Sequence, residues 1–392
     1  MTQSNELVRA PLTRNPGESV VQRVRLLLLI PRLGGGGAQH VIALLGKNLS
    51  QEKYEIHLGL VAADEADSAT LPPWLKVHAL GARRVRNGAV PLLRLVWRLR
   101  PHVILSGAAE VNFLALLLRP LFPPGTSVLV RQNGTVSLAL IYGGVPRYTR
   151  WGYRLLYPHA NRVICQSRAM ADDLTRTLKL DGEKITVLPN PVDLEQIRAA
   201  MQAPSARMGP GPHLLAVGRL SHEKGFDLLL NALATVRKVH PGADLIIAGE
   251  GRDEPELKEL CRALFLESAV SFVGYVVPVY AFFPGATLFV HSSRYEGMPN
   301  SLLEAAAAGL PLVATPASEG IVDLLRGQPG AWLAPEITAE SLAATLLTAL
   351  ETLEPGKRYR RSFFPSFDDA PAREDACSLE SDTPATDSQM SR

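Results

Sequence analysis

Short apolar runs recur along the chain, and segments of helical composition separate them. Residues 24–30 form one such run, which Pro31 ends, and residues 38–49 then have the composition of a helix. Apolar runs that alternate with helices are typical of parallel strands buried on both faces. The chain is therefore predicted to be an α/β protein with doubly wound parallel sheets. Its further strands are predicted at 54–61, 75–80, 103–105, 128–130, 162–165, 185–188, 214–217, 243–248, 270–273, 287–290 and 311–315.

The chain length of 392 residues exceeds a single typical core and suits two domains of roughly 150 to 200 residues each. A segment rich in Ala, Pro and Gly at 203–212 has the composition of a linker. We therefore expect an N-terminal Rossmann-like domain at 23–205 and a C-terminal one at 206–355. The polar composition of 1–22 predicts a flexible leader, and the Ser, Asp, Thr and Pro content of 356–392 predicts a disordered tail.

The composition is that of a globular protein, with 46% hydrophobic and 20% charged residues. The apolar runs are far shorter than the roughly 20 residues of a transmembrane helix. The polar start also lacks the apolar stretch of a signal peptide. Three widely spaced cysteines, Cys165, Cys261 and Cys377, predict a reducing cytoplasm and neither a disulfide framework nor a zinc site.

The net charge of +3 hides an asymmetry between the two halves. Residues 1–200 hold 25 Lys and Arg against 14 Asp and Glu, whereas residues 201–392 hold 16 against 24. A basic first half predicts an acidic surface or acceptor beside it, with anionic lipid headgroups as one candidate. A basic domain with no particular partner explains the same counts equally well, and no nucleic-acid partner is expected.

Two glutamates, Glu296 and Glu304, flank a turn between a predicted strand and an alanine-rich helix. A glycine and a proline break the strand, and Asn300 or Ser301 is predicted to be the N-cap of the helix. The free N–H groups at a helix start favour a phosphate. A carboxylate one turn further on, Glu304, suits the paired hydroxyls of a ribose. This stretch predicts a nucleotide-sugar site, and two solvated glutamates beside an ordinary turn are the alternative.

A second group of phosphate-binding residues is predicted after the strand at 214–217. Gly218 and Arg219 follow that strand, and Lys224 comes just before a helix at 226–240. A guanidinium can bind two phosphate oxygens, and an ammonium supplies a point charge. The two cations therefore predict a diphosphate site, with two solvated loop cations as the alternative.

A glycine-rich loop at 34–37 follows the first predicted strand and precedes a helix. Such a loop brings backbone N–H groups close to a ligand at the sheet edge. Its sequence is not G-x-G-x-x-G and no P-loop lysine follows, which argues against a dinucleotide or ATP site.

Together, the spacing of Glu296 and Glu304, the cations Arg219 and Lys224, and the sequence Gly36-Gly37-Ala38-Gln39 resemble the retaining glycosyltransferases of family 4. The resemblance extends over residues 24–350. It implies a GT-B fold, in which two Rossmann-like domains face each other across a cleft. It also implies transfer of a hexose from a nucleoside diphosphate sugar to an acceptor hydroxyl. Family members usually carry an acid at the position of Gln39.

The resemblance assigns catalytic roles to Glu296, Arg219 and Lys224. The two cations neutralise the leaving diphosphate, and Glu296 binds the donor sugar or stabilises positive charge at its anomeric carbon. Neither a metal nor a cofactor is expected, because the nucleotide sugar is itself the donor substrate. The implied donor-binding residues are Gly36, Gly37, Gly218, Arg219, Lys224, Val273, Gly274, Glu296, Gly297, Met298, Asn300, Ser301, Leu302 and Glu304.

Candidates for the acceptor side are Asn112, Arg131 and Asn133, in loops that follow predicted strands of the first half. Many relatives carry a histidine or an acid in one of these loops, and Glu110 is the residue here that could fill that role. Segments 91–99 and 147–157 combine arginines with tryptophan and tyrosine. They predict either a membrane surface and a lipid-linked acceptor, or ordinary helix packing.

The resemblance implies glycan, polysaccharide or lipid-linked saccharide biosynthesis, in the cytoplasm or peripherally on the inner face of the cell membrane. Two alternatives keep the fold. One is a nucleotide-sugar epimerase or a sugar-phosphate synthase. The other is a nucleotide-sugar-binding protein with impaired turnover, since the chain after residue 354 lacks the family's helix that crosses back onto the first domain. UDP and GDP are both compatible with the sequence.

Overall fold

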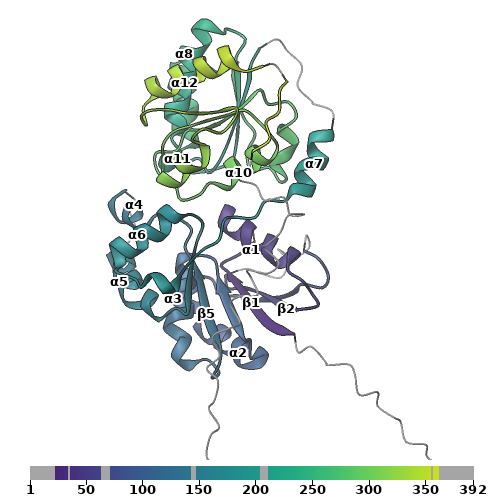
Figure 1. Cartoon of the computed structure of the whole chain (residues 1–392), viewed down its shortest axis with the longest axis vertical. Helices are drawn as coiled ribbons and strands as arrows, with labels where there is room; N and C mark the ends of the chain where they lie inside the picture. The colour runs from purple at the N-terminus through teal and green to yellow at the C-terminus, as the bar shows by residue number, and fades with distance from the viewer. Residues whose placement is uncertain are drawn as a thin grey trace, which may run out of the picture.

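The computed structural model describes residues 23–33, 36–62, 71–142, 147–203, 211–354 and 356–361. Two α/β domains lie one above the other along the long axis of the molecule (Figure 1). The first contains a parallel sheet with strand order β3-β2-β1-β4-β5-β6-β7, and the second a parallel sheet with order β10-β9-β8-β11-β12-β13. Both orders reverse direction beside the first strand of the domain, as in doubly wound folds. The predicted fold class is confirmed.

Strand β1 (Val24–Ile30) shows why the first sheet is covered on both faces. Leu27 and Leu29 pack with helices α2 and α3 on one face, whereas Leu28 and Ile30 pack with α1 on the other. A strand that is apolar on both faces is stable only between two layers of helices. The other strands of this sheet are β2 (Tyr54–Leu60), β3 (Lys76–Ala79), β4 (Val103–Ser106), β5 (Ser127–Arg131), β6 (Arg162–Cys165) and β7 (Ile185–Val187).

The helices of the first domain connect these parallel strands. Its longer helices are α1 (Gly37–Asn48), α2 (Ala89–Leu99), α3 (Ala109–Leu118), α4 (Val136–Tyr142), α5 (Arg147–Leu156) and α6 (Arg168–Leu178). Short 3-10 turns are η2 (Val85–Gly88), η3 (Arg119–Leu121), η4 (Tyr157–His159) and η5 (Gly182–Lys184).

The second domain repeats this arrangement around β8 (His213–Val217). Leu214 and Ala216 face the helices α8 and α12, and Leu215 faces α7, η7 and α10. The other strands are β9 (Asp244–Ala248), β10 (Val270–Phe272), β11 (Leu288–His291), β12 (Leu312–Ala314) and β13 (Ala331–Leu333). The helices are α7 (Leu194–Gln202), η6 (His222–Lys224), α8 (Phe226–Val239), α9 (Glu254–Ala263), η7 (Val279–Phe282), α10 (Asn300–Ala307), α11 (Glu319–Leu325) and α12 (Ala339–Thr352).

The predicted range of the first domain, 23–205, includes the residues of helix α7, but this helix packs on the second domain. It lies beside the second domain in Figure 1. Ile197 is buried there in one cluster with Phe283 and Leu302. The chain therefore passes between the domains in the segment after β7, and the remaining domain bounds stay predictions. The leader at 1–22 lies outside the described residues.

The start of the predicted tail is also packed rather than disordered. Arg361 is 7% exposed. Its guanidinium donates to the carbonyl oxygens of Leu310 at 2.8 Å and Gly330 at 3.0 Å, and to that of Ala306 at 3.3 Å. Composition did not indicate this contact, because it joins a side chain to distant backbone groups. Residues 362–392 lie outside the described part of the chain.

Among the described residues, no helix has the length and apolar content needed to span a membrane.

Candidate active site

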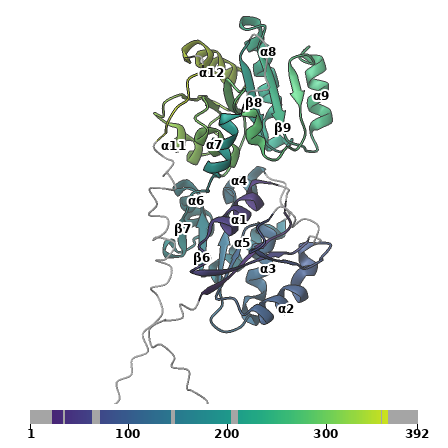
Figure 2. The same ribbon diagram turned by 90° about the vertical axis from the view of Figure 1, so that its right-hand side faces the viewer.

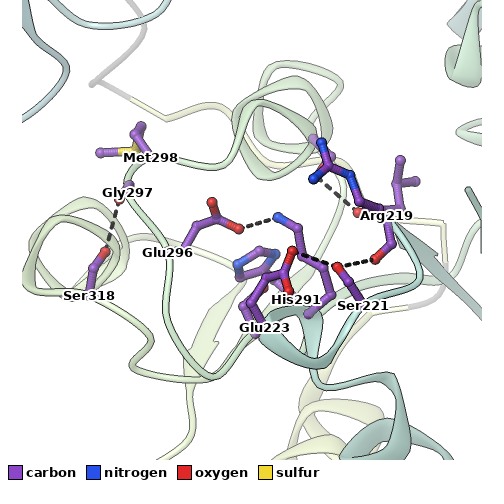
Figure 3. A network of polar contacts seen from close by, with 12 residues as sticks. Arg219, Ser221, Glu223, His291, Glu296, Gly297, Met298 and Ser318 are labelled. Atoms are coloured by element: carbon purple, nitrogen blue, oxygen red, sulfur yellow. Dashed lines mark hydrogen bonds and ion pairs between the residues drawn. The ribbon is translucent and has the colours of Figure 1, made fainter. Parts of the chain in front are cut away.

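The carboxyl ends of β8 and β11 meet at the point where the second sheet reverses its strand order. The loop after β8 carries Lys224, and the loop after β11 carries Glu296. The ammonium of Lys224 donates a hydrogen bond to the Glu296 carboxylate, and both side chains are less than one-fifth exposed. Figure 3 shows Glu296 in this network beside His291, with Arg219 on the opposite side. The structure thus brings the predicted catalytic residues to one sheet edge.

The charge state of Glu296 follows from its surroundings. Burial by itself would raise the pKa of the carboxyl, but the Lys224 ammonium and the N–H of Gly297 hold it below the ordinary value. Burial and the nearby charge of Lys224 lower the pKa of His291 to about 4. At neutral pH the site therefore contains a carboxylate, an ammonium and a neutral imidazole. The Nε2 atom of that imidazole is buried and has no hydrogen-bond partner among the described residues.

A second ion pair fixes the loop between β11 and α10. The guanidinium of Arg294 donates two hydrogen bonds to the Asp227 carboxylate at 2.7 and 2.6 Å, and a third to the carbonyl oxygen of His222 at 3.0 Å. Asp227 lies in the first turn of α8, three residues after Lys224 in the chain. This bidentate contact sets the position of Glu296 relative to Lys224.

Arg219 faces the glycine-rich loop of the first domain. A Cβ atom added to Gly36 would lie 3.4 Å from Nη2 of Arg219. Gly36 has a φ of 147°, a value that residues other than glycine rarely adopt. The loop that carries Arg219 is held by Ser221, whose hydroxyl contacts the Glu223 carboxylate at 2.6 Å and the Arg219 carbonyl oxygen at 3.3 Å (Figure 3). Gly36 and Arg219 therefore lie at the boundary between the domains, and Gly218 lies against the side chain of Lys224.

Helix α10 begins at Asn300, so Pro299 takes the N-cap position that was predicted for Asn300 or Ser301. Within the described part of the chain, no side chain caps this N-terminus. Fully buried Leu302 anchors the first turn, and the Ser301 hydroxyl donates to the Val217 carbonyl oxygen at 3.2 Å. The preceding turn is fixed by Ser318, whose hydroxyl donates to the Gly297 carbonyl oxygen at 3.0 Å. The arrangement leaves the positive end of the helix dipole directed at the first domain, beside Gly37, where it can stabilise an anion.

Glu304 lies inside α10 and is 8% exposed. Burial raises the pKa of its carboxyl to about 7, against the opposing effect of a hydrogen bond from the Tyr280 hydroxyl at 3.3 Å. Asp193 contributes a smaller increase, and Nε2 of His40 lies 3.9 Å away. Glu304 is therefore partly protonated at neutral pH, and partners that donate hydrogen bonds to it would favour its ionised form.

Val273 and Gly274 lie in the loop after β10, beside the loop after β9. The Gly249 N–H donates to the Gly274 carbonyl oxygen at 2.8 Å, and the Tyr275 N–H to the Glu250 carboxylate at 3.2 Å. These two loops end neighbouring strands of the same sheet as Lys224 and Glu296. The predicted contact of Val273 and Gly274 with a nucleobase stays a prediction.

The three acceptor-side candidates have different surroundings. Asn112 is fully buried in α3, where the predicted loop is instead a helix. Its side chain contacts the Ser106 hydroxyl, the Arg131 carbonyl oxygen and the Tyr157 hydroxyl, so it supports the core and faces no acceptor. Helix α3 is apolar on nearly all sides, so no helical periodicity indicated it. Glu110 is exposed in its first turn.

Arg131 and Asn133 instead lie where the first domain contacts the second. Arg131 is 4% exposed and donates to the side-chain oxygens of Asn133 and Asn190. The Thr135 hydroxyl donates to the Glu296 carbonyl oxygen at 3.4 Å. Asn190 and Thr135 were absent from the predicted site, since only a Pro-Asn-Pro turn signal marked the first and nothing local marked the second.

Comparisons with solved structures define the class of fold. Sucrose-phosphate synthase from Thermosynechococcus elongatus has a TM-score of 0.71 at 18% identity, over 84% of this chain and 90% of that one. HepE from Anabaena, in complex with UDP and glucose, has a TM-score of 0.68 at 18% identity, over the same shares. The fold is therefore GT-B.

Two family models match consecutive parts of the chain. Residues 35–196 match "Glycosyltransferase Family 4", and residues 211–352 match "Glycosyl transferases group 1". The chain belongs to the family 4, group 1 glycosyltransferases, and its class of reaction is hexosyl transfer. The family and enzyme class expected from the sequence are confirmed.

Curated relatives cover different shares of the chain. N-acetylgalactosamine-N,N'-diacetylbacillosaminyl-diphospho-undecaprenol 4-alpha-N-acetylgalactosaminyltransferase from Campylobacter jejuni is 27% identical over 349 residues, which are 86% of this chain and 93% of the relative. Glycogen synthase from Mycobacterium tuberculosis is 33% identical over 234 residues. The chain spans about half of the length of that synthase, 54%, and 59% of this chain is matched.

Proposed function

We propose that this protein moves a hexose from a nucleoside diphosphate hexose, with UDP as the first nucleotide to test, to an acceptor hydroxyl. The observation that carries the proposal is the convergence of Lys224, Glu296 and the uncapped start of α10 at one sheet edge. In the reaction, the bond from the anomeric carbon to a diphosphate oxygen breaks and a bond to the acceptor oxygen forms. Negative charge grows on the diphosphate, where fixed positive groups stabilise it.

Each group has a distinct part in this proposal. Arg219 and Lys224 bind the diphosphate, and Glu304 accepts hydrogen bonds from the ribose hydroxyls. Glu296, which is ionised at neutral pH, stabilises positive charge at the anomeric carbon. Neutral His291 has an unpartnered Nε2 atom beside Glu296 and is suited to a sugar hydroxyl. Retention of configuration and independence from metal ions are expectations carried by the family. The complex of HepE with UDP and glucose supports UDP as the first probe.

Titration calorimetry with UDP, GDP and ADP tests the donor site. We expect one diphosphate to bind selectively. Glu304→Ala should bind it roughly 10- to 100-fold more weakly, because a hydrogen bond to a charged group contributes about 1.5–3 kcal/mol. Glu351→Ala, which removes an exposed carboxylate from α12, is the matched control and should bind normally. If no nucleotide binds the intact chain, the donor-site assignment is wrong.

Product analysis separates transfer from the reactions of an epimerase or a sugar-phosphate synthase, which would give an isomerised nucleotide sugar or a phosphorylated disaccharide.

One side of the first domain carries exposed apolar and basic side chains, which suggest where the acceptor is found. Helices α5, α3 and α2 follow one another down this side (Figure 2), and α3 packs on α5 through Phe113 and Tyr153. The indole N–H of Trp97 on α2 donates to the Leu121 carbonyl oxygen at 2.9 Å. We call this side the basic apolar face. Its exposed apolar residues are Trp97, Leu117, Leu121, Trp151 and Leu155, and its exposed or half-buried arginines are Arg94, Arg98, Arg119, Arg150 and Arg154.

The charge of this region matches an anionic bilayer. Residues 71–162 contain thirteen Lys and Arg but a single acid, Glu110. Arginines beside exposed tryptophan and leucine are the groups that bind anionic lipid headgroups and the interfacial layer below them. We therefore propose peripheral binding to the inner face of the cell membrane, with a lipid-linked saccharide as acceptor. The diphospho-undecaprenol in the name of the Campylobacter jejuni relative supports this acceptor class.

Vesicle flotation tests the membrane contact. The intact chain should bind phosphatidylglycerol vesicles, release at high salt, and not bind phosphatidylcholine vesicles. The double variant Arg150→Glu, Arg154→Glu should bind at least roughly 30-fold more weakly, since each basic residue near an anionic surface contributes about 1 kcal/mol. Lys238→Glu on α8 of the second domain is the control and should bind normally. Equal binding to both kinds of vesicle would contradict an electrostatic membrane contact.

A further inference from the structure

The segment that joins the two domains carries a side chain bonded to both. Asn190 lies between Pro189 and Pro191, after β7 and before α7. Its side-chain oxygen accepts a hydrogen bond from Arg131 of the first domain. Its side-chain nitrogen donates to the Asn300 side-chain oxygen and, at 3.4 Å, to the Met298 carbonyl oxygen, both in the second domain. Two flanking prolines restrict the backbone here, which fixes the direction of the side chain.

The hydrogen bonds continue beyond Asn190 in one direction. The Asn300 side-chain nitrogen donates to the Gly37 carbonyl oxygen at 2.8 Å, which returns the chain of bonds to the first domain. Arg131 has only donors, so it orients the oxygen of Asn190 toward itself. The nitrogen of Asn190 then faces Asn300 and orients that amide in turn. Neither amide can rotate by half a turn without losing bonds at both of its ends.

Arg131 is a suitable fixed end for this chain of bonds. It is almost fully buried, and burial lowers its pKa to about 10, so it is charged at neutral pH. Its second hydrogen bond goes to Asn133, whose nitrogen donates to the Gly107 carbonyl oxygen at 2.5 Å. The guanidinium is therefore immobile relative to the first sheet.

The second domain contacts the same region of the first domain at the turn before α10. A Cβ atom added to Gly297 would lie 2.7 Å from the Asn133 carbonyl oxygen, so the backbone of this turn lies directly against the backbone of the first domain. The proposed catalytic residue Glu296 and the start of α10 thus lie on either side of a turn that the first domain holds. A change in the relative position of the domains would move both.

We propose that Asn190 is a positioning residue, which holds the donor loop at 296–300 in register with the first domain and so couples domain closure to turnover. The inference rests on the proposed function, since it takes α10 and Glu296 to be the donor site. Asn190 itself does not contact the donor. Its loss should therefore leave nucleotide binding nearly intact, because Arg219, Lys224 and Glu304 all belong to the second domain. Turnover, which needs the two domains in a fixed relative position, should fall.

Asn190→Asp separates positioning from support of the fold. The aspartate keeps the shape and gives Arg131 a carboxylate partner, but it cannot donate to Asn300. If Asn190 only satisfied Arg131, this variant would match the intact chain in turnover and in closure. If Asn190 positions the donor loop, the variant should remain as thermally stable as the intact chain yet hydrolyse UDP-glucose at least tenfold more slowly, since small misplacements have large effects on rate. Asn231→Ala, which removes an exposed asparagine of α8, is the control.

Small-angle X-ray scattering and calorimetry with UDP complete the test. We expect Asn190→Asp to have a larger radius of gyration than the intact chain, with UDP affinity within threefold. A variant with the scattering of the intact chain would overturn the inference, whatever its rate. Failure of the intact chain to bind UDP would count against UDP as the donor nucleotide, while the scattering comparison would still decide the role of Asn190.

Discussion

Lys224→Ala is expected to reduce kcat for hexosyl transfer by about 10²–10³-fold, the usual effect of removing one group that stabilises developing negative charge. The variant loses a cation of the proposed diphosphate site. It also leaves the Glu296 carboxylate buried without its partner, and breaking a buried pair costs about 3–5 kcal/mol. Both effects follow from the single contact between the two side chains. Steady-state kinetics with the donor identified by calorimetry would measure the first, and thermal unfolding the second.

A double-variant cycle separates the two effects. Adding Glu296→Gln to Lys224→Ala removes the uncompensated charge, so stability should recover while kcat stays low. Lys258→Ala breaks an exposed pair with Glu254 on α9 and should change neither property. If Lys224→Ala keeps normal kcat, the lysine belongs to the fold rather than to the chemistry.

The pKa of Glu296 lies below its ordinary value, so the stability that the pair provides should be present at neutral pH and lost as the pH falls below about 4.5.

Glu304→Gln is expected to make the nucleotide-free protein more stable at pH 8 and to weaken nucleotide binding. Burial raises the pKa of Glu304 to about 7 in the folded protein, against 4.5 for an ordinary glutamate. Between these values the unfolded chain releases its proton while the folded chain keeps it, so stability falls as the pH rises. Above pH 7 the loss is complete, on the order of 3 kcal/mol. Glutamine does not ionise and avoids this loss.

Chemical unfolding at pH 5 and pH 8 measures the difference. The advantage of Glu304→Gln should be small at pH 5 and large at pH 8, and Glu351→Gln on the exposed face of α12 should show none. Saturating nucleotide should reduce the advantage, because ribose hydroxyls that donate to the ionised carboxylate stabilise the wild-type chain more than the glutamine variant. An advantage equal at both pH values would show that burial of the charge is not the cause.

The parts of the structure that sequence predicted are those fixed by local patterns. An apolar strand such as β1 shows its burial on both faces in its own residues, and the spacing of Glu296 and Glu304 spans one turn and one helix start. The contacts that sequence did not predict join distant positions. The partners of Asn190 lie 59 and 110 residues away along the chain. Asn112 shows the opposite error, since this polar residue after a strand is fully buried and its side chain bonds to groups of the core.

The packed segment before residue 362 has an electrostatic consequence for the donor site. Arg361 donates to the carbonyl oxygens of Ala306 and Leu310, at the C-terminal end of α10. A cation there complements the negative end of the helix dipole, while the positive end faces the first domain. Arg361 thus stabilises the dipole of the same helix whose N-terminal end is proposed to bind the diphosphate. A residue in the segment whose composition predicted disorder therefore contributes, through α10, to the electrostatic field at the proposed diphosphate site.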